Sequence, residues 1–552
     1  MNTIIKSALI IIGSILIATG CTSYFDNMNT DPNNPTPGNT DPKFQFAYAQ
    51  SRSILYANQW QVGDQMTACH FAQFAANDPL SSSDYSIDAR YIQGIWDLTY
   101  SSLSNFNTII RKFENDPNRV NIVQMSKIWK VWLMLRLTDY LGDIPYSQAA
   151  NAEATNPVYD TQKDIYYLMF QELSQATSKL DSKADNIGTY DIVFGSDVTK
   201  WAKFANSLRL RMALRIADVD NAKAVEEAKK AIDGGLISSA QDAAAVKMGN
   251  DKVELNSQNP IYFHRKQSVI HMSTSYYKLV ENLGGINWPT LADQKENSNI
   301  TSYIVDAAIH PAKVDPRSVF HFEPSGVTEK VTTEKLDRNW AGTDPGNVSS
   351  GVGAAMETGQ FQNDYAKIGE FYYSKPDRSY PIMKYSEVCF LKAIAIEKGI
   401  ISGDAKSMYE EGIKDNMAEF NIPTSIVNAY LNSTDANFYG TTVKYDHRSG
   451  NTNTALDKIL TQKYLSHFVE GSFEAWADHR QYHKPTLMPF AHVNQSTFIM
   501  DANAQKNNTP DAYIKRGFYP SSEESVNKAN LDEAIKRMGS NSVQNNVWWD
   551  KK

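Results

Sequence analysis

Three acidic side chains with helical spacing are the residues best placed to do chemistry in this chain. Glu470, Glu474 and Asp478 recur every four residues, so they share one face if the segment is helical. A pair of carboxylates can supply the acid and the base of glycoside hydrolysis. Acids in such a row more often form a solvated or arginine-paired stripe, and Arg480 lies close in sequence. We therefore expect ion pairing, with hydrolysis as the weaker alternative.

Two histidines follow the acids at metal-binding spacing. His479 and His483 are four residues apart, as in a zinc-binding helix, but the segment His-Arg-Gln-Tyr-His lacks the glutamate of a metalloprotease helix, and Lys484-Pro485 ends it. We expect surface or capping histidines and no metal. The sequence also contains no phosphate-binding loop, dinucleotide fingerprint or nucleophile elbow. We therefore predict no catalytic residue, no cofactor and no enzymatic activity.

Aromatic residues in polar, loop-like segments are candidate sugar-binding residues. The apolar faces of sugar rings stack on tryptophan and tyrosine, while sugar hydroxyls bond to Asn, Asp, Gln and Arg. Trp288, Trp340, Tyr85 and Tyr91 all have such polar neighbours in sequence. In such a segment an aromatic side chain is as easily a binding platform as a packing residue.

Other aromatic residues are predicted to pack. Trp129, Trp132 and Trp201 lie in helical segments and should belong to the core. Residues 371–373 (Phe-Tyr-Tyr) follow Tyr365 in strand-like text. We expect these side chains to pack beneath a loop.

Helical periodicity predicts the scaffold that must position these residues. Apolar side chains recur every three or four residues along 165–180 and 456–468, which is typical of amphipathic helices. Segment 125–142 is apolar on most faces and should be a buried helix. Segments 225–237 and 387–417 look like helix pairs closed by glycine. The second has the form of a degenerate tetratricopeptide unit.

The predicted helix at 201–217 carries arginines within an apolar pattern. Arg209, Arg211 and Arg215 lie close to the expected core. Each therefore requires an acidic partner or a path to solvent for its charged end. Both arrangements are compatible with the sequence.

Two regions interrupt the helical pattern. Residues 76–94 are polar and rich in turn-forming residues, and residues 250–380 combine few apolar stripes with many Pro, Gly, Asn and aromatic residues. We predict long loops and short strands there, mounted on the helical scaffold. Binding residues commonly lie on loops that a rigid scaffold positions.

The charge composition argues against one class of partner, nucleic acid. It has 552 residues, a net charge of −8 and no long basic stretch, so we expect no nucleic-acid partner. Its three cysteines are Cys21, Cys69 and Cys389. The last two lie in apolar helical text and should be buried free thiols.

The N-terminus has the pattern of an export signal. Lys6 precedes an apolar run that ends at Ala18 and is too short to span a bilayer comfortably. Ala-Thr-Gly-Cys then resembles a bacterial lipobox, although leucine is commonest where Ala18 stands. The resemblance implies a signal peptide at 1–20 and a lipid on Cys21. Residues 21–42, rich in Pro, Asn and Asp, would form a flexible tether.

Seven segments, in order, resemble the SusD/RagB family of Bacteroidetes outer-membrane lipoproteins. They are NMNTDPNNPT in the tether, LRLTDYLGDIPYSQA (135–149), NPVYDTQKDIYYLMFQEL (156–173), KWAKFANSLRLRMALRI (200–216), YPIMKYSEVCFLKAIAIEKG (380–399), QKYLSHFVEGSFEAWADHRQYHKPTL (462–487) and VWWDKK (547–552). The resemblance covers nearly the whole chain after Cys21. It departs at Gln481, where the family often has a second arginine, and at Lys392-Ala393-Ile394, where Ala-Glu-Ala is common. Both departures concern scaffold helices.

The resemblance implies an all-α, SusD-like domain over residues 43–552. Tetratricopeptide-like helix pairs would occupy about 43–250 and 380–552, and a loop-rich ligand-binding region with minor short strands about 250–380. Family members are lipid-anchored in the outer membrane and face the cell exterior. They cap a SusC-like TonB-dependent transporter, capture glycan (in some members peptide) and are not enzymes.

The resemblance also indicates where a ligand would bind. Family members contact it through the loop after the first helices and through loops of the central region, whereas the shared motifs are scaffold elements. Position and chemistry therefore select the candidate residues Asn77, Asp78, Tyr85, Arg90, Trp288 and Trp340. An oligosaccharide is the expected ligand. The alternatives are peptide capture, a secreted glycoside hydrolase and a purely structural transporter subunit.

Overall fold

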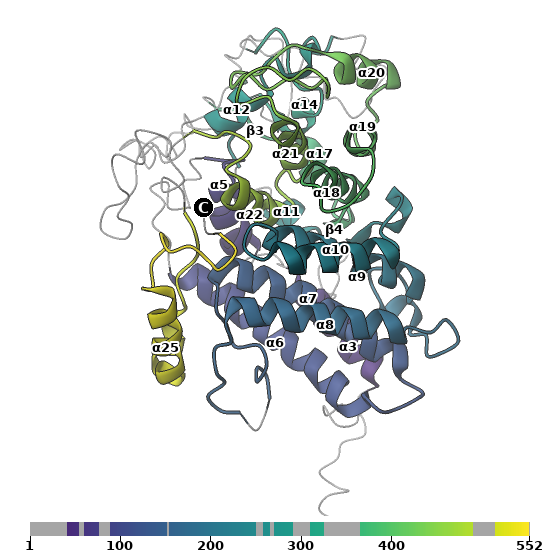
Figure 1. The fold of residues 1–552 in the computed structure, drawn as a ribbon, viewed down its shortest axis with the longest axis vertical. Coiled ribbons are helices and arrows are strands. Elements are labelled where there is room, and N and C mark those ends of the chain that lie inside the picture. Colours follow the sequence, from purple (N-terminus) through teal and green to yellow (C-terminus); the bar gives the residue numbers. More distant parts are fainter. Residues whose placement is uncertain are drawn as a thin grey trace, which may run out of the picture.

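The computed structural model describes residues 41–54, 60–76, 89–151, 154–249, 258–264, 270–290, 310–324, 340, 365–488 and 514–550. Figure 1 shows the fold as two stacked groups of helices. The lower group contains α3 (Pro42–Ser53), α6 (Ala89–Phe113), α7 (Val120–Leu141), α8 (Gln162–Lys179), α9 (Val198–Ile216) and α10 (Asn221–Asp233). Short 3-10 turns, η2 (Gly188–Tyr190) and η3 (Ala240–Asp242), follow α8 and α10.

Helix α7 is the centre of the lower group. It packs against α3, α6, α8 and α9, and also against α22 (Ser472–Tyr482) of the upper group. This crowding buries most of the helix and confirms the prediction made for 125–142. The helix ends at Leu141 and is capped by Gly142, whose φ of +91° would strain any other residue.

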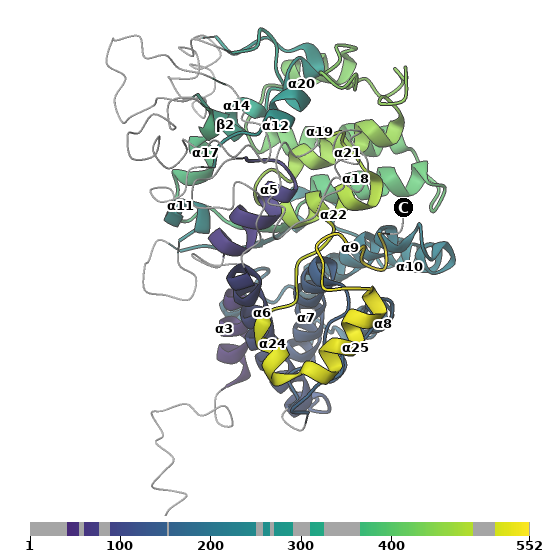
Figure 2. The same ribbon diagram turned by 90° about the vertical axis from the view of Figure 1, so that its left-hand side faces the viewer.

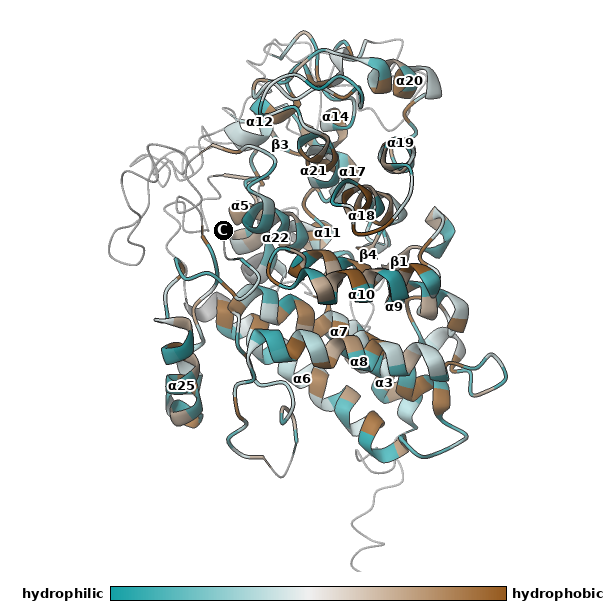
Figure 3. Ribbon diagram, in the orientation of Figure 1, coloured by the Kyte–Doolittle hydropathy of each residue, from teal (hydrophilic) through white to brown (hydrophobic). Residues whose placement is uncertain are grey.

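The upper group contains the predicted helix pair. Helix α18 (Tyr385–Glu397) packs against α19 (Ala405–Ala418), and Gly399 and Gly403 in the connection have positive φ. Figure 3 colours α18 brown because it is apolar on most faces, as a helix between two others must be. Helices α20 (Thr424–Asn432), α21 (Ala455–Ser466) and α22 complete this group. The all-α architecture with tetratricopeptide-like pairs is thus confirmed.

The arginines of α9 have acidic partners on four neighbouring helices, α7, α10, α18 and α22. Arg209 pairs with Glu227 on α10. Arg211 donates to both oxygens of Glu387 on α18, each at 2.8 Å. Arg215, whose partners include a carboxylate of α7, completes the set. Acidic partners, rather than contact with solvent, therefore stabilise these buried arginines. The ion pairs between α9 and the upper helices also join the two groups.

Short elements make up the described part of the loop-rich region, much of which lies beside the upper group in Figures 1 and 2. Strand β1 (Ala244–Val246) pairs antiparallel with β4 (Tyr380–Met383), so the two ends of this region meet. Strand β2 (Phe322–Glu323) pairs with β3 (Lys367–Ile368). The short helices are α11 (Pro260–His264), α12 (Thr274–Val280), η4 (Leu283–Gly285), α14 (Ser318–His321) and α17 (Glu370–Tyr373). Loops and short strands were predicted here. The structure also contains short helices, which were not predicted.

Two local expectations were wrong. The strand-like residues 371–373 form the helical turn α17, which is closed by Ser374 N–H donating to the carbonyl of Glu370 at 2.9 Å. A run of consecutive aromatic residues does not distinguish a strand from one helical turn. Residues 89–94 of the loop expected over 76–94 instead belong to α6, which begins at Ala89.

The C-terminal segment returns to the lower group. Helices α24 (Ser521–Val526) and α25 (Lys528–Met538), yellow in Figure 2, lie beside the lower helices, and α24 contacts α6. Near the chain end, the Trp549 indole N–H donates to Asp139 Oδ1 on α7 at 2.8 Å. The tail therefore stabilises the junction between the two groups.

The predicted core residues are confirmed. Trp129, Trp132 and Trp201 are buried, and Cys69 and Cys389 are buried free thiols. Cys69 begins the short helix α5 (Cys69–Phe71), which directly follows a π-helical segment, η1 (Gln61–Ala68). Within the described residues, no helix is both long enough and apolar enough to cross a membrane.

Candidate functional site

The carboxylates considered for hydrolysis are held in buried or partly buried ion pairs. Glu474 accepts hydrogen bonds from Arg215 at 2.9 Å and from Arg211 at 3.3 Å. Burial opposes ionisation of Glu474, but the two guanidinium groups outweigh it and lower its pKa to about 2. The general acid of a glycosidase needs a raised pKa. Glu474 is therefore unsuited to donate that proton.

The other two acids also have partners, but not the expected one. Asp478 pairs with Lys463, and Glu470, which precedes α22, pairs with Arg378. Arg480 instead donates to two backbone carbonyl groups, each at 2.8 Å. The prediction of ion pairing is thus correct, whereas the assignment of Arg480 as the partner is wrong.

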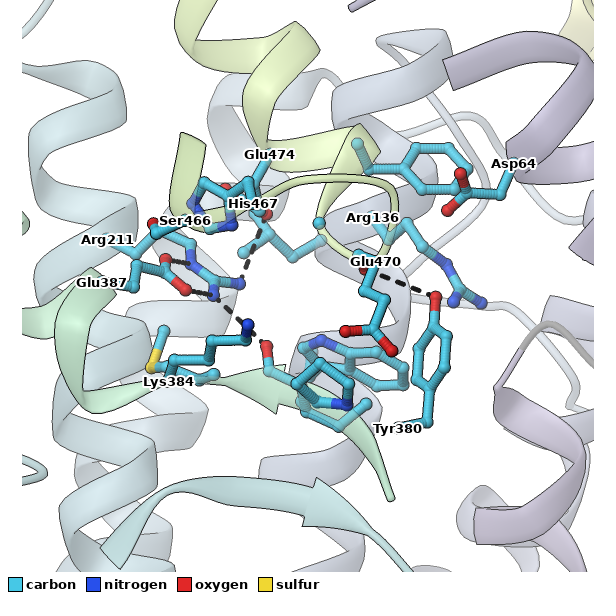
Figure 4. Close-up of a pocket in the computed structure, with 17 residues that line it drawn as sticks. Asp64, Arg136, Arg211, Tyr380, Lys384, Glu387, Ser466, His467, Glu470 and Glu474 are labelled. Atoms are coloured by element: carbon cyan, nitrogen blue, oxygen red, sulfur yellow. Dashed lines mark hydrogen bonds and ion pairs between the residues drawn. The ribbon is translucent and has the colours of Figure 1, made fainter. Parts of the chain in front are cut away.

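Three members of these ion pairs, Arg211, Glu470 and Glu474, line a small cavity at the junction of the two helix groups, shown in Figure 4. Its labelled residues come from η1, α7, α9, α18, β4 and the α21–α22 segment. The cavity measures about 70 Å³. Such a volume holds a few water molecules, whereas ligand sites typically measure about 300 Å³ or more. The junction is therefore a structural site rather than a sugar-binding one.

The variant Glu474→Gln distinguishes a structural role of the junction from glycoside hydrolysis. We expect no release of reducing sugar by the native protein or the variant. The free energy of unfolding should fall by about 1–3 kcal/mol, because the amide cannot replace a carboxylate between two arginines. Chemical denaturation and a reducing-sugar assay measure the two quantities. The matched variant Glu524→Gln, at an exposed position of α24, should change stability by less than about 0.5 kcal/mol. Sugar release that disappears in Glu474→Gln would instead support hydrolysis.

The two histidines occupy different environments. His483 ends α22 in the left-handed conformation, with φ of 52°, so a capping position is confirmed for it. His479 is buried, and burial, together with the neighbouring His483 and two other cations, lowers its pKa to about 3. A surface position for His479 was therefore a wrong expectation. Among the described residues, no group of His, Cys, Asp and Glu side chains is arranged to hold a metal ion.

A larger cavity lies in the loop-rich region, beside Trp288. It measures about 400 Å³, within the usual range of small-molecule sites. Its walls come from segments 285–290, 314–320 and 422–426. Residues far apart in the sequence therefore enclose one space, and the last wall belongs to the N-terminal turn of α20 and the residues before it.

An irregular two-stranded ribbon positions Trp288. The backbone N–H of Trp288 donates to the carbonyl of Ala312 at 3.0 Å, and Val314 N–H donates to Ile286 at 2.8 Å. The ribbon follows Gly284, whose φ is +80° and whose missing Cβ would collide with the Tyr430 ring. Only glycine combines this backbone conformation with this close approach. The Gly-Gly pair before Trp288 is therefore a sequence signal for the turn.

Of the two predicted tryptophans, Trp288 lines this cavity and Trp340 packs against Trp288. Their ring centroids are 5.4 Å apart with an interplanar angle of 72°. Trp288 lines the cavity, and His310 stacks on its ring at 4.4 Å. Trp340 is fully buried, and its indole N–H donates to the carbonyl of Phe322 at 3.3 Å. Trp340 thus supports Trp288 from the side and does not line the cavity.

A buried arginine fixes the 314–320 wall. Arg317, fully buried, donates to Asp315 at 2.7 Å and 3.0 Å, to Asn416 at 2.9 Å and to Gln462 at 2.6 Å. Burial opposes its charge, but Asp315 outweighs this and raises the pKa of Arg317. Tyr430 also donates to Asp315. The network joins the wall to α19, α20 and α21.

Comparison with protein families identifies the chain. A family model described as SusD-like, starch-binding and associating with the outer membrane matches residues 33–505. The chain belongs to the SusD-like family. Among curated proteins, no sequence matches it.

Solved SusD-like structures share the fold over nearly the whole chain. A SusD homologue from Parabacteroides distasonis is 30% identical, with a TM-score of 0.82, and the match covers 93% of this chain and 98% of that one. A homologue from Bacteroides uniformis is 24% identical, with a TM-score of 0.70 and coverage of 93% and 100%. A chitin-binding homologue from Flavobacterium johnsoniae is 22% identical, with a TM-score of 0.72 and coverage of 93% and 99%. The last two show the likeness of fold alone.

The remaining candidate residues of this SusD-like chain stay predictions. Asn77, Asp78 and Tyr85 lie outside the described residues. Arg90 and Tyr91 are in the first turn of α6, and their side chains are likewise outside the described part. The structure therefore places two of the six predicted binding residues, Trp288 and Trp340, near one cavity.

The cavity wall formed by 422–426 was not predicted from the sequence. Ile422 and Ile426 line the cavity, but their segment reads only as a short apolar run. Val319 and Phe320 were missed for the same reason. Local patterns do not show which apolar residues face a ligand, because that depends on how distant segments pack.

Proposed function

We propose that this SusD-like protein captures oligosaccharide at the cell surface and delivers it to a SusC-like TonB-dependent transporter. The main supporting observation is the cavity of about 400 Å³ lined by Trp288, in a member of a family described as starch-binding. The chitin-binding description of a structural neighbour agrees with a glycan ligand. The ion-paired state of Glu474 argues against hydrolysis.

Capture rests on a rigid aromatic surface. His310 stacks on Trp288 and Trp340 packs against it, so little side-chain freedom is lost when a ligand binds. Aromatic stacking with a few hydrogen bonds gives affinities on the order of micromolar to millimolar. A lipid on Cys21 and the tether 21–42 would hold the domain on the outer face of the outer membrane. Tethering beside the transporter raises the effective concentration, so weak binding suffices.

The test is binding to a panel of polysaccharides and a panel of peptides, by affinity electrophoresis and calorimetry. At least one neutral glycan should bind, and Trp288→Leu should weaken that binding by about tenfold, because an aromatic surface is lost. The matched control Phe438→Leu alters an exposed aromatic residue that does not line the cavity, and it should bind normally. Thermal melting checks that both variants fold. Binding to peptides alone would overturn glycan capture.

A further inference from the structure

The described lining of the cavity beside Trp288 carries no charged side chain. None of the described residues that line it is ionisable, and among them only Asn287 and Thr290 have a polar side chain other than the Trp288 indole. Lys313 on the ribbon forms an ion pair with Asp435 at 2.6 Å, but this pair is partly exposed and does not line the cavity. A charged ligand group would be desolvated there without a partner. The lining therefore favours a neutral ligand.

The surface around Trp288 is largely aliphatic. Ile286, Val319, Ile422 and Ile426 contribute to it, from three separate segments. A sugar hydroxyl placed against these side chains would lose its water without gaining a hydrogen bond, which weakens binding by roughly tenfold per group. A ring that carries hydroxyls on every side is thus a poor fit. An apolar substituent on the ring would fill the same space favourably.

We propose that the cavity takes an N-acetylated sugar, with the ring on Trp288 and the acetyl methyl group against the aliphatic wall. An acetamido group is neutral and places a methyl group beside one amide. Asn287 precedes Trp288 in the ribbon and lines the cavity, so it can bond that amide. About 400 Å³ accommodates one substituted ring. This inference rests on the proposed glycan capture and specifies its substrate class.

The test compares two β-1,4-linked oligosaccharides of equal length, one of N-acetylglucosamine and one of glucose. Calorimetry with the whole mature chain should show tighter binding of the N-acetylated one, on the order of tenfold. Ile426→Trp fills the cavity from a half-buried position on α20 and should abolish this preference. Ser425→Trp, at the adjacent exposed position that does not line the cavity, should retain it.

The outcomes distinguish this inference from the proposed function. Equal affinity for the two oligosaccharides, or tighter binding of the glucose one, overturns the acetyl preference and leaves glycan capture standing. A preference that Ile426→Trp does not change, in a variant that melts like the native protein, also overturns it. Binding of neither oligosaccharide, with another glycan bound, has the same consequence. If no glycan binds, the proposed glycan capture is itself overturned.

Discussion

Arg317→Met should lower the free energy of unfolding by about 3–5 kcal/mol. Methionine fills a similar space but leaves the carboxylate of Asp315 fully buried without its cation. It also removes the donors to Asn416 and Gln462, which lie on α19 and α21. Denaturant unfolding followed by circular dichroism measures the loss. Because Pro316 and Val319 line the cavity on either side of Arg317, ligand binding should weaken as well.

Two further variants test the cause of that loss. Lys313→Met removes a cation from the same segment, but its pair with Asp435 is partly exposed, so the expected loss is about 0–1 kcal/mol. Asp315→Asn combined with Arg317→Met removes both buried charges and should be more stable than Arg317→Met alone. A double variant no more stable than the single one would contradict the assignment of the loss to an unpaired buried carboxylate.

Much of the scaffold could be predicted because each helix carries its own signals. Helix α8 is capped by Thr161, whose side chain accepts from the N–H of Asp164, and α21 begins with a capping box of Thr454 and Asp457. The α18–α19 pair combines apolar periodicity with glycines at the turn. Such features are local, so the sequence shows them directly.

The site was harder to predict because its contacts are distant in sequence. Arg317 bonds to residues 99 and 145 positions away, and these bonds join the 314–320 wall to α19 and α21. Trp340 has polar sequence neighbours, yet Tyr277 and Trp288 pack on its ring. Proximity in sequence likewise favoured Arg480 as the partner of the acids on α22. Packing between segments, which no local pattern encodes, decided each of these cases.

Asp64→Asn should stabilise the protein increasingly as the pH rises from about 4 to about 7. Asp64 lies in η1, is 1% exposed and faces the cavity of Figure 4. Burial, with a smaller contribution from Glu470, raises its pKa from 3.8 to about 7, although Ser472 and Arg136 oppose the shift. Between these values the unfolded chain has released the proton and the folded chain has kept it. Stability therefore falls with rising pH, by roughly 4 kcal/mol in total. Asparagine has no proton to release.

The difference in unfolding free energy between Asp64→Asn and the native protein is the quantity to measure, at several pH values. The native profile alone is insufficient, because burial also raises the pKa of Asp415, to about 6. Asp446→Asn is the control, since a hydrogen bond from Lys406 lowers the pKa of that exposed carboxylate and its difference should stay constant above pH 5. A constant difference for Asp64→Asn as well would show that Asp64 is ionised in the folded protein. A rising one would mean that the junction of the two helix groups carries a neutral Asp64 below pH 7, and that acidification strengthens it.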